Sequence, residues 1–168
     1  KAILSGITLA TLLTACGNDK QLPENTISTD FESLGQWSKS AVIAKGIAHS
    51  GLYSTFTDSS HEYSQTFEVA LADLPVKTPK KITVKAWVMG KSMNTDSKLV
   101  VSVEKDGKSI AWQGDGVKPV IKAPMTWTEF QTSVNVGTTI PDGAILKIYG
   151  WNQGKEPVYF DDVAISLE

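Results

Sequence analysis

The 168-residue sequence contains no arginine, a single cysteine and only two histidines, and each scarcity excludes something. Arginine supplies the usual fork for phosphate and guanine, so sixteen lysines without any arginine argue against a nucleic-acid partner. One cysteine excludes an intrachain disulfide, so an exported domain would depend on its core or on a metal for stability. The formal net charge of −2 gives no electrostatic attraction to anionic lipid.

Motifs for covalent or metal-dependent catalysis are also missing from the chain. There is no Gly-x-Ser-x-Gly elbow and no histidine pair at metal-binding spacing. Two carboxylates might converge in the fold as they do in glycoside hydrolases, and the sequence leaves that alternative open. The case for an enzyme from these motifs is thin, and the resemblance described below is what favours binding without catalysis.

Cys16 ends an apolar run that follows Lys1, and Leu13-Thr14-Ala15-Cys16 matches the bacterial lipobox. The run is shorter than the ~20 apolar residues of a membrane-spanning helix but suits a signal peptide. We predict a lipoprotein signal peptide over residues 1–15, a lipidated Cys16 with a flexible tether over 16–28, and one domain over 29–168. The alternative is a buried N-terminal helix with a core cysteine, which the polar residues 17–20 disfavour.

This anchor predicts a location. A lipid-modified Cys16 tethers the domain to a membrane of the cell envelope, outside the cytoplasm. Gly17, in place of aspartate after the cysteine, favours the outer membrane under the enterobacterial sorting rule. The sequence leaves open which side of that membrane the domain faces and whether an enzyme lies beside it.

Short β-branched and aromatic runs, separated by Gly, Pro, Asn, Asp and Ser clusters, predict an all-β domain. The expected strands are Ile27–Glu32, Trp37–Ile43, Tyr53–Thr57, Tyr63–Val69, Ile82–Met89, Leu99–Glu104, Ile110–Gln113, Trp127–Val136, Ile145–Trp151 and Val158–Leu167. Residues 105–108 (Lys-Asp-Gly-Lys) carry a hairpin turn signal. No stretch has a helical apolar stripe. This spacing indicates a two-sheet antiparallel β-sandwich of the jelly-roll kind.

Side-chain alternation sorts the strand residues into two faces. Ile82, Val84, Ala86 and Val88 share one face, as do Leu146 and Ile148 in a later strand. The opposite faces carry aromatic rings next to lysine, glutamate or glutamine. The aromatic and polar residues on these faces are Trp87, Tyr149, Trp151, Lys85, Lys147, Glu129 and Gln131.

Five segments together resemble the calcium-containing jelly-roll carbohydrate-binding modules of families four, nine and twenty-two and their galactose-binding-like relatives. These segments are Asp30–Trp37, Ala48–Ser54, Val84–Val88, Trp127–Phe130 and Val158–Ile165. The last of them is the most specific match. Their order and spacing span nearly the whole domain. The chain departs from enzyme-appended members in being a lone domain behind a lipobox.

The resemblance implies a structural calcium ion. It assigns Glu32 and Asp161 as ligands, with Asp30 as a further candidate and backbone carbonyls of the turn at residues 49–54 supplying the remaining oxygens. Such an ion would join the first and last strands. The alternative is that these are surface carboxylates at strand ends.

The resemblance also implies that the ligand is a carbohydrate. Flat aromatic rings suit the C–H faces of pyranose rings, and polar side chains suit the hydroxyl groups. Trp87, Tyr149 and Trp151 are the candidate platforms, although each could instead pack beneath a loop. The candidate polar contacts are Lys85, Lys147, Glu129, Gln131, Gln113 and Asn152. Trp37 and Trp127 are expected to be structural, and Trp112 is either a loop tip or a core residue. A structural or adhesion module that binds a protein through the same face is the alternative function.

Overall fold

The computed structural model describes residues 24–35, 37 and 42–168, and it is an antiparallel β-sandwich. Its ten strands are β1 (Thr26–Thr29), β2 (Ile43–Lys45), β3 (Tyr53–Thr57), β4 (Phe67–Ala70), β5 (Lys81–Gly90), β6 (Ser97–Lys105), β7 (Lys108–Gly116), β8 (Thr128–Asn135), β9 (Ile145–Asn152) and β10 (Val158–Leu167). Two single-turn 3₁₀ helices, η1 (Leu71–Asp73) and η2 (Lys118–Val120), lie in connections. Across the described ranges there is no α-helix, as the sequence predicted.

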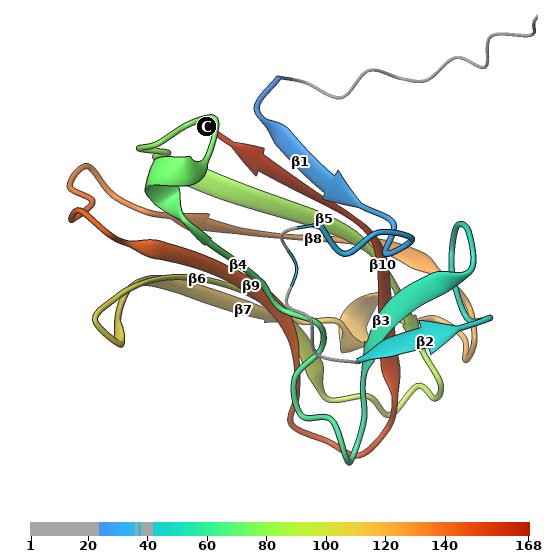
Figure 1. The fold of residues 1–168 in the computed structure, drawn as a ribbon. Helices are drawn as coiled ribbons and strands as arrows, with labels where there is room; N and C mark the ends of the chain where they lie inside the picture. The colour runs from blue at the N-terminus through green and yellow to red at the C-terminus, as the bar shows by residue number, and fades with distance from the viewer. Residues whose placement is uncertain (1–23, 36, 38–41) are drawn as a thin grey trace, which may run out of the picture.

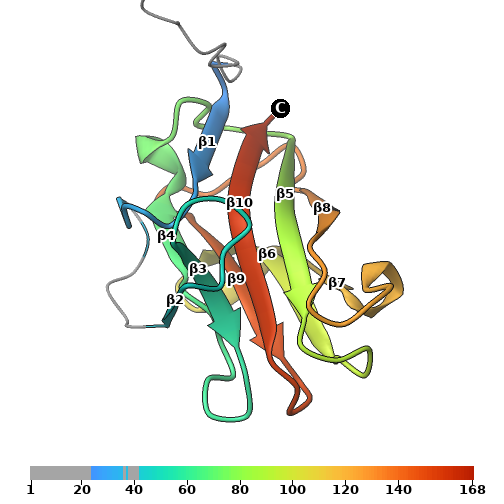
Figure 2. The same ribbon diagram turned by 90° about the vertical axis from the view of Figure 1, so that its right-hand side faces the viewer.

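The strands form two sheets that stack face to face (Figure 1). In this article, sheet A is β2-β3-β10-β5-β8 with β1 also paired to β10, and sheet B is β4-β9-β6-β7. Strand β10 is the centre of sheet A: β1 and β3 lie one after the other along one edge of it, and β5 lies along the other (Figure 2). First and last strands of the domain are thus direct neighbours.

The core lies between the two sheets and is built from the alternating apolar rows. Ile82, Val84 and Val88 of β5 and Leu146 and Ile148 of β9 are fully buried, which confirms the predicted inward faces. The predicted hairpin turn is also confirmed, because Lys105 pairs with Lys108. Asp106 and Gly107 both have positive φ, 50° and 72°, as a turn matching the twist of the flanking strands requires.

The strand boundaries differ from the predicted ones where tertiary contacts override local pattern. The predicted strand Trp37–Ile43 contributes only an isolated bridge between Trp37 and Phe67 and the start of β2, and residues 38–41 of it lie outside the described part. Strand β7 is longer than predicted because Gly114 and Gly116, which read as turn residues, continue the ladder with β6. Phe130 of β8 is only half-buried, although Val134 on the same face of that strand is buried.

The predicted signal peptide, Cys16 and most of the tether lie outside the described residues. Among the residues that are described, no helix is long and apolar enough to cross a membrane.

Candidate functional site

The outer face of sheet B carries a shallow groove of about 400 Å³. Its lining side chains are Tyr63, Thr66, Glu68, Glu104, Lys147 and Tyr149. The register explains this grouping, because residues paired across antiparallel strands project from the same face. One row crosses all four strands, running through Trp112, Ser102, Lys147 and Glu68.

Tyr63 and Tyr149 form the aromatic wall of the groove. Their rings meet edge to face, with centroids 5.6 Å apart and an interplanar angle of 73°. Tyr63 remains 49% exposed, so about half of its surface is open to a ligand. Burial raises the pKa of Tyr149, with a hydrogen bond from Trp112 working against the shift, so the hydroxyl stays protonated at neutral pH.

Trp112 of β7 provides a second exposed ring on the same face, because it is 44% exposed. Its indole lies over Gly114: a Cβ added at that glycine would be 2.5 Å from Trp112 Cη2. The absence of a side chain at Gly114 therefore lets the ring lie flat along the sheet. Trp112, which the sequence left undecided between loop tip and core, belongs to neither.

Trp151 is held by its neighbours. Its indole N–H donates to Glu62 Oε1 at 3.0 Å, and the Lys98 ammonium lies 5.3 Å from the ring centroid. A lysine over an indole is a stabilising cation–π contact, and it covers one ring face. Trp151 thus lies beside Tyr63, its bridge partner, and is not among the residues that line the groove, whereas Tyr63 and Trp112 are the more exposed rings.

The polar centre of the groove is an ordered charge pair. Lys147 Nζ lies 3.0 Å from Glu104 Oε2, and the Ser102 hydroxyl donates to Glu104 Oε1 at 2.9 Å. Burial raises the pKa of Glu104, but the hydrogen bonds from Lys147 and Ser102 and the lysine charge outweigh it and leave that pKa lowered. The hydrogen bond to Glu104 raises the pKa of Lys147. Both groups are charged at neutral pH.

The remaining predicted ligand residues do not lie in this groove. Lys85, Trp87, Glu129 and Gln131 are on the outer face of sheet A, where Lys85 pairs with Gln131 and Trp87 pairs with Glu129. The predicted set is therefore divided between opposite faces of the sandwich. Alternation determines which side of its own strand a residue occupies, but it does not determine which sheet contains that strand.

Trp87 packs beneath a loop, as the alternative for this residue proposed. The His49 imidazole stacks on it at 3.8 Å with an interplanar angle of 11°, and His49 also meets Trp127 edge to face at 5.9 Å. These contacts cover the Trp87 face that a sugar would need. Trp127 and Trp37 have the structural roles expected of them, Trp37 packing against Phe31 and Phe67 in the core.

Asn152 is a correction of another kind. It is 4% exposed, its amide donates to the Glu156 carbonyl at 3.2 Å, and its Oδ1 accepts the Gly154 N–H at 2.8 Å. Tyr149 and Trp151 project outward, so the next residue along β9 projects inward. Asn152 therefore fixes the β9–β10 loop. Gln113 likewise bonds Asp115, which also accepts from Thr132 of β8 and links the two sheets at their edge.

The two carboxylates assigned to calcium converge on one turn. Glu32 Oε1 accepts the backbone N–H groups of Leu52 and Tyr53 at 2.5 and 2.8 Å. Asp161 Oδ2 accepts those of His49 and Ser50 at 2.7 and 3.1 Å. Residues near the two ends of the domain thus hold the same turn against sheet A.

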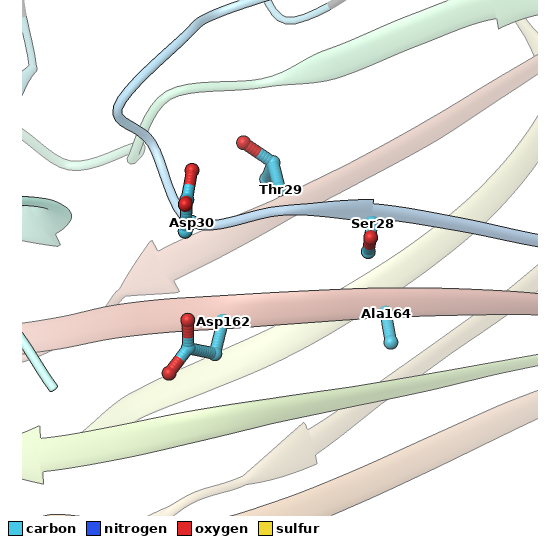
Figure 3. Close-up of a pocket in the computed structure, with 5 residues that line it drawn as sticks. All are labelled: Ser28, Thr29, Asp30, Asp162 and Ala164. Carbon is cyan, nitrogen blue, oxygen red and sulfur yellow. The ribbon is translucent and has the colours of Figure 1, made fainter. Parts of the chain in front are cut away.

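Asp30 has a different place. Its Oδ1 accepts the Glu32 N–H at 3.1 Å, and its side chain lines a depression beside Asp162 on β10 (Figure 3). In the described part of the chain, no three His, Cys, Asp or Glu side chains are grouped to hold a metal ion. An ion at this turn would therefore take Glu32 and Asp161 together with backbone oxygens.

Asp161 suits such an ion. It is fully buried, and burial raises its pKa despite hydrogen bonds from the N–H groups of Asp162, Ser50 and His49. A buried carboxylate left ionised is costly unless a cation or donors compensate it, and hard carboxylate and carbonyl oxygens are the donors calcium prefers. Here N–H donors occupy both oxygens of Asp161 and Oε1 of Glu32, so an ion at this turn would have to replace some of these hydrogen bonds.

Sequence reasoning missed Tyr63, Glu68 and Glu104 as residues that line the groove, and Trp112 as an exposed ring on the same face. Glu68, Glu104 and Trp112 lie at strand positions that alternation assigns to the outer face of sheet B once the strand bounds are known. Tyr63 lies before β4 and reaches the groove through its bridge to Trp151, a pairing that no local pattern announces.

The fold is a jelly-roll β-sandwich, and the solved structures that share it include carbohydrate-binding modules. Among solved structures, the CBM22-2 xylan-binding domain of Paenibacillus barcinonensis Xyn10C is 18% identical over 84% of this chain and 99% of its own, with a TM-score of 0.55. The CBM22-1 domain of the same protein is 19% identical over 84% and 92%, with a TM-score of 0.52. Their tandem matches 91% of this chain and 52% of its own at 18% identity, with a TM-score of 0.58.

Comparison of the sequence itself gives no such likeness. No protein-family model matches the chain, and no curated protein matches it. At 18–19% identity, what the chain shares with the CBM22 domains is the fold.

Proposed function

We propose that this domain binds a glycan, without catalysis, in the groove on the outer face of sheet B. The observation that carries the proposal is that two exposed rings, Tyr63 and Trp112, lie on one face of the sheet. The Lys147–Glu104 ion pair lies between them in the direction across the strands. Aromatic rings give contact area to pyranose C–H faces, and the carboxylates and ammonium can bond hydroxyls.

The fold supports the same proposal. The neighbouring structures with TM-scores above 0.5 include domains described as xylan-binding. A polysaccharide or oligosaccharide is therefore the first ligand class to test. A protein partner on the same face is the competing outcome of that test.

The test compares ring truncations on the two faces. Tyr63→Ala and Trp112→Ala should each weaken binding to a glycan found by array screening at least ~10-fold, which corresponds to about 1.4 kcal/mol. Their melting temperatures should change little, because both rings are largely exposed. Met93→Ala, an exposed apolar truncation in a loop, and Gln131→Ala, on the opposite face, are the matched controls.

Binding that survives both ring truncations but fails in Gln131→Ala would move the site to sheet A. Absence of any glycan hit, together with retention of a protein partner, would favour the adhesion alternative.

We also propose that the domain is anchored in the cell envelope through a lipid on Cys16, and that calcium binds at the turn held by Glu32 and Asp161. The lipobox residues 13–16 support the first. The two carboxylates on one turn and the burial of Asp161 support the second.

A further inference from the structure

Charge in the groove is unevenly distributed, and this suggests a selectivity that its shape alone would not give. Of the six described residues that line it, one is a cation, Lys147, and two are carboxylates, Glu68 and Glu104. Glu68 is the direct cross-strand neighbour of Lys147 in β4, and Glu104 is bonded to it from β6. The lysine is thus flanked by acids on both sides.

The pairing of Lys147 with Glu104 is fixed by several contacts. The 3.0 Å ion pair is only partly exposed, with side-chain exposures of 29% and 25%, and Ser102 holds the second carboxylate oxygen of Glu104. The lowered pKa of Glu104 and the raised pKa of Lys147 agree with a charged pair. Lys98, another lysine on this face, pairs with Trp151 across the strands and lies over its ring.

An acidic sugar would meet unfavourable electrostatics here. A uronate carboxylate or sulfate group entering the groove approaches two carboxylates and an ammonium that is already neutralised. Like charges oppose its binding, and binding it would require the ion pair to break. Neutral hydroxyl groups face no such penalty, because they can donate to the carboxylates and accept from the ammonium.

We propose that Glu104 determines charge selectivity: by neutralising Lys147, it makes the groove accept uncharged glycans and reject uronate-bearing or sulfated ones. This inference rests on the proposed glycan-binding function. It assigns a specificity-determining role to a residue that would otherwise count only as one half of a surface ion pair.

The experiment measures the ratio of affinities for two probes, an oligogalacturonate and a neutral xylo-oligosaccharide of matched length, by calorimetry. In Glu104→Gln the ratio of uronate to neutral affinity should rise at least ~10-fold over wild type. The gained uronate binding should weaken with added salt. Adding Lys147→Gln to Glu104→Gln should remove the gain, because the freed ammonium carries it. Glu129→Gln, the same charge change on sheet A, is the control and should leave the ratio at its wild-type value.

The outcomes separate the selectivity from the proposed function. An unchanged ratio in Glu104→Gln, or wild-type binding of the uronate as tight as that of the neutral probe, overturns the role of Glu104 while glycan binding stands. A Lys147-dependent gain of uronate binding in a protein that never binds the neutral probe upholds the role of Glu104 and counts against the proposed ligand class. If folded wild-type protein and folded Glu104→Gln both bind neither probe, both proposals fail.

Discussion

Alanine at two glycines of sheet B tests which of its faces is the open one. Gly114 and Gly150 lie on different strands and face opposite ways. A Cβ at Gly114 would be 2.5 and 2.7 Å from the outer atoms of Trp112, whereas a Cβ at Gly150 would be 2.5 and 2.9 Å from Cε2 and Cζ of Phe160. Phe160 is 1% exposed and Trp112 is 44% exposed, so only the second ring can move into solvent.

The two substitutions should therefore differ in what they damage. Gly150→Ala forces an extra carbon into a packed core and should cost about 1–3 kcal/mol of stability. Gly114→Ala should change stability by less than ~1 kcal/mol, since a displaced exposed ring costs little and replacing glycine restricts the unfolded chain. It should still weaken glycan binding by about 10-fold, because the Trp112 ring leaves its position over the sheet.

Chemical denaturation and calorimetric titration of both variants measure these effects. In a Trp112→Ala background, Gly114→Ala should have no further effect on affinity, because no ring remains to be displaced. Equal destabilisation by both alanines, or a stable Gly150→Ala protein, would refute the assignment of the two faces.

Three further predictions concern the turn, the anchor and the groove charge. If calcium binds at the turn held by Asp161, chelator should lower the melting temperature of wild type, and Asp161→Ala should remove that sensitivity. The expected stabilisation is ~3 kcal/mol at a calcium concentration a hundredfold above Kd. Identical melting of wild type with chelator and with millimolar calcium would count against the ion. Cys16→Ser should abolish labelling by a fatty-acid probe in cells, and equal labelling of both proteins would contradict the lipobox. The pKa of Glu104 is lowered in the fold, so its pair with Lys147 stabilises the protein fully at pH values above 4.5, the ordinary pKa of a glutamate. This stabilisation is lost as the pH falls through the lower pKa of Glu104 in the folded protein. The wild-type advantage over Glu104→Gln, about 0.5 kcal/mol at neutral pH, should thus disappear in acid denaturation series below pH 4.5.

Much of the fold follows from local pattern, and the reason is visible in β5 and β9. Ile82, Val84, Leu146 and Ile148 lie in the core because successive side chains of a strand point to opposite faces, and these residues share the face that is apolar in each strand. Turn chemistry set the β6–β7 hairpin at Asp106 and Gly107, since both residues tolerate positive φ. These features depend on neighbours in sequence.

The candidate binding residues depend instead on neighbours in space. Trp87 and Trp151 have the same local signature, an aromatic opposite an aliphatic row, yet a histidine stacks on one and a lysine covers the other. Tyr63 and Trp112 lack a distinctive local signature and remain open. Side chains from other parts of the fold determine which ring is exposed. The sequence therefore identified the type of residue in the site but not the particular residues.

The structure also gives a reason why, among the described residues, the exposed aromatic rings lie on sheet B and not on sheet A. The turn around His49 crosses the outer face of sheet A and covers Trp87, and Glu32 and Asp161 hold that turn in place through its backbone N–H groups. Among the described residues, sheet B has no comparable covering of its Tyr63 and Trp112 rings. The carboxylates assigned to calcium therefore act on the face opposite the groove, as part of the fold's framework. It follows that loss of Asp161 should lower stability while leaving the uronate-to-neutral affinity ratio of the folded protein unchanged. Loss of Glu104 should raise that ratio and lower stability by only about 0.5 kcal/mol.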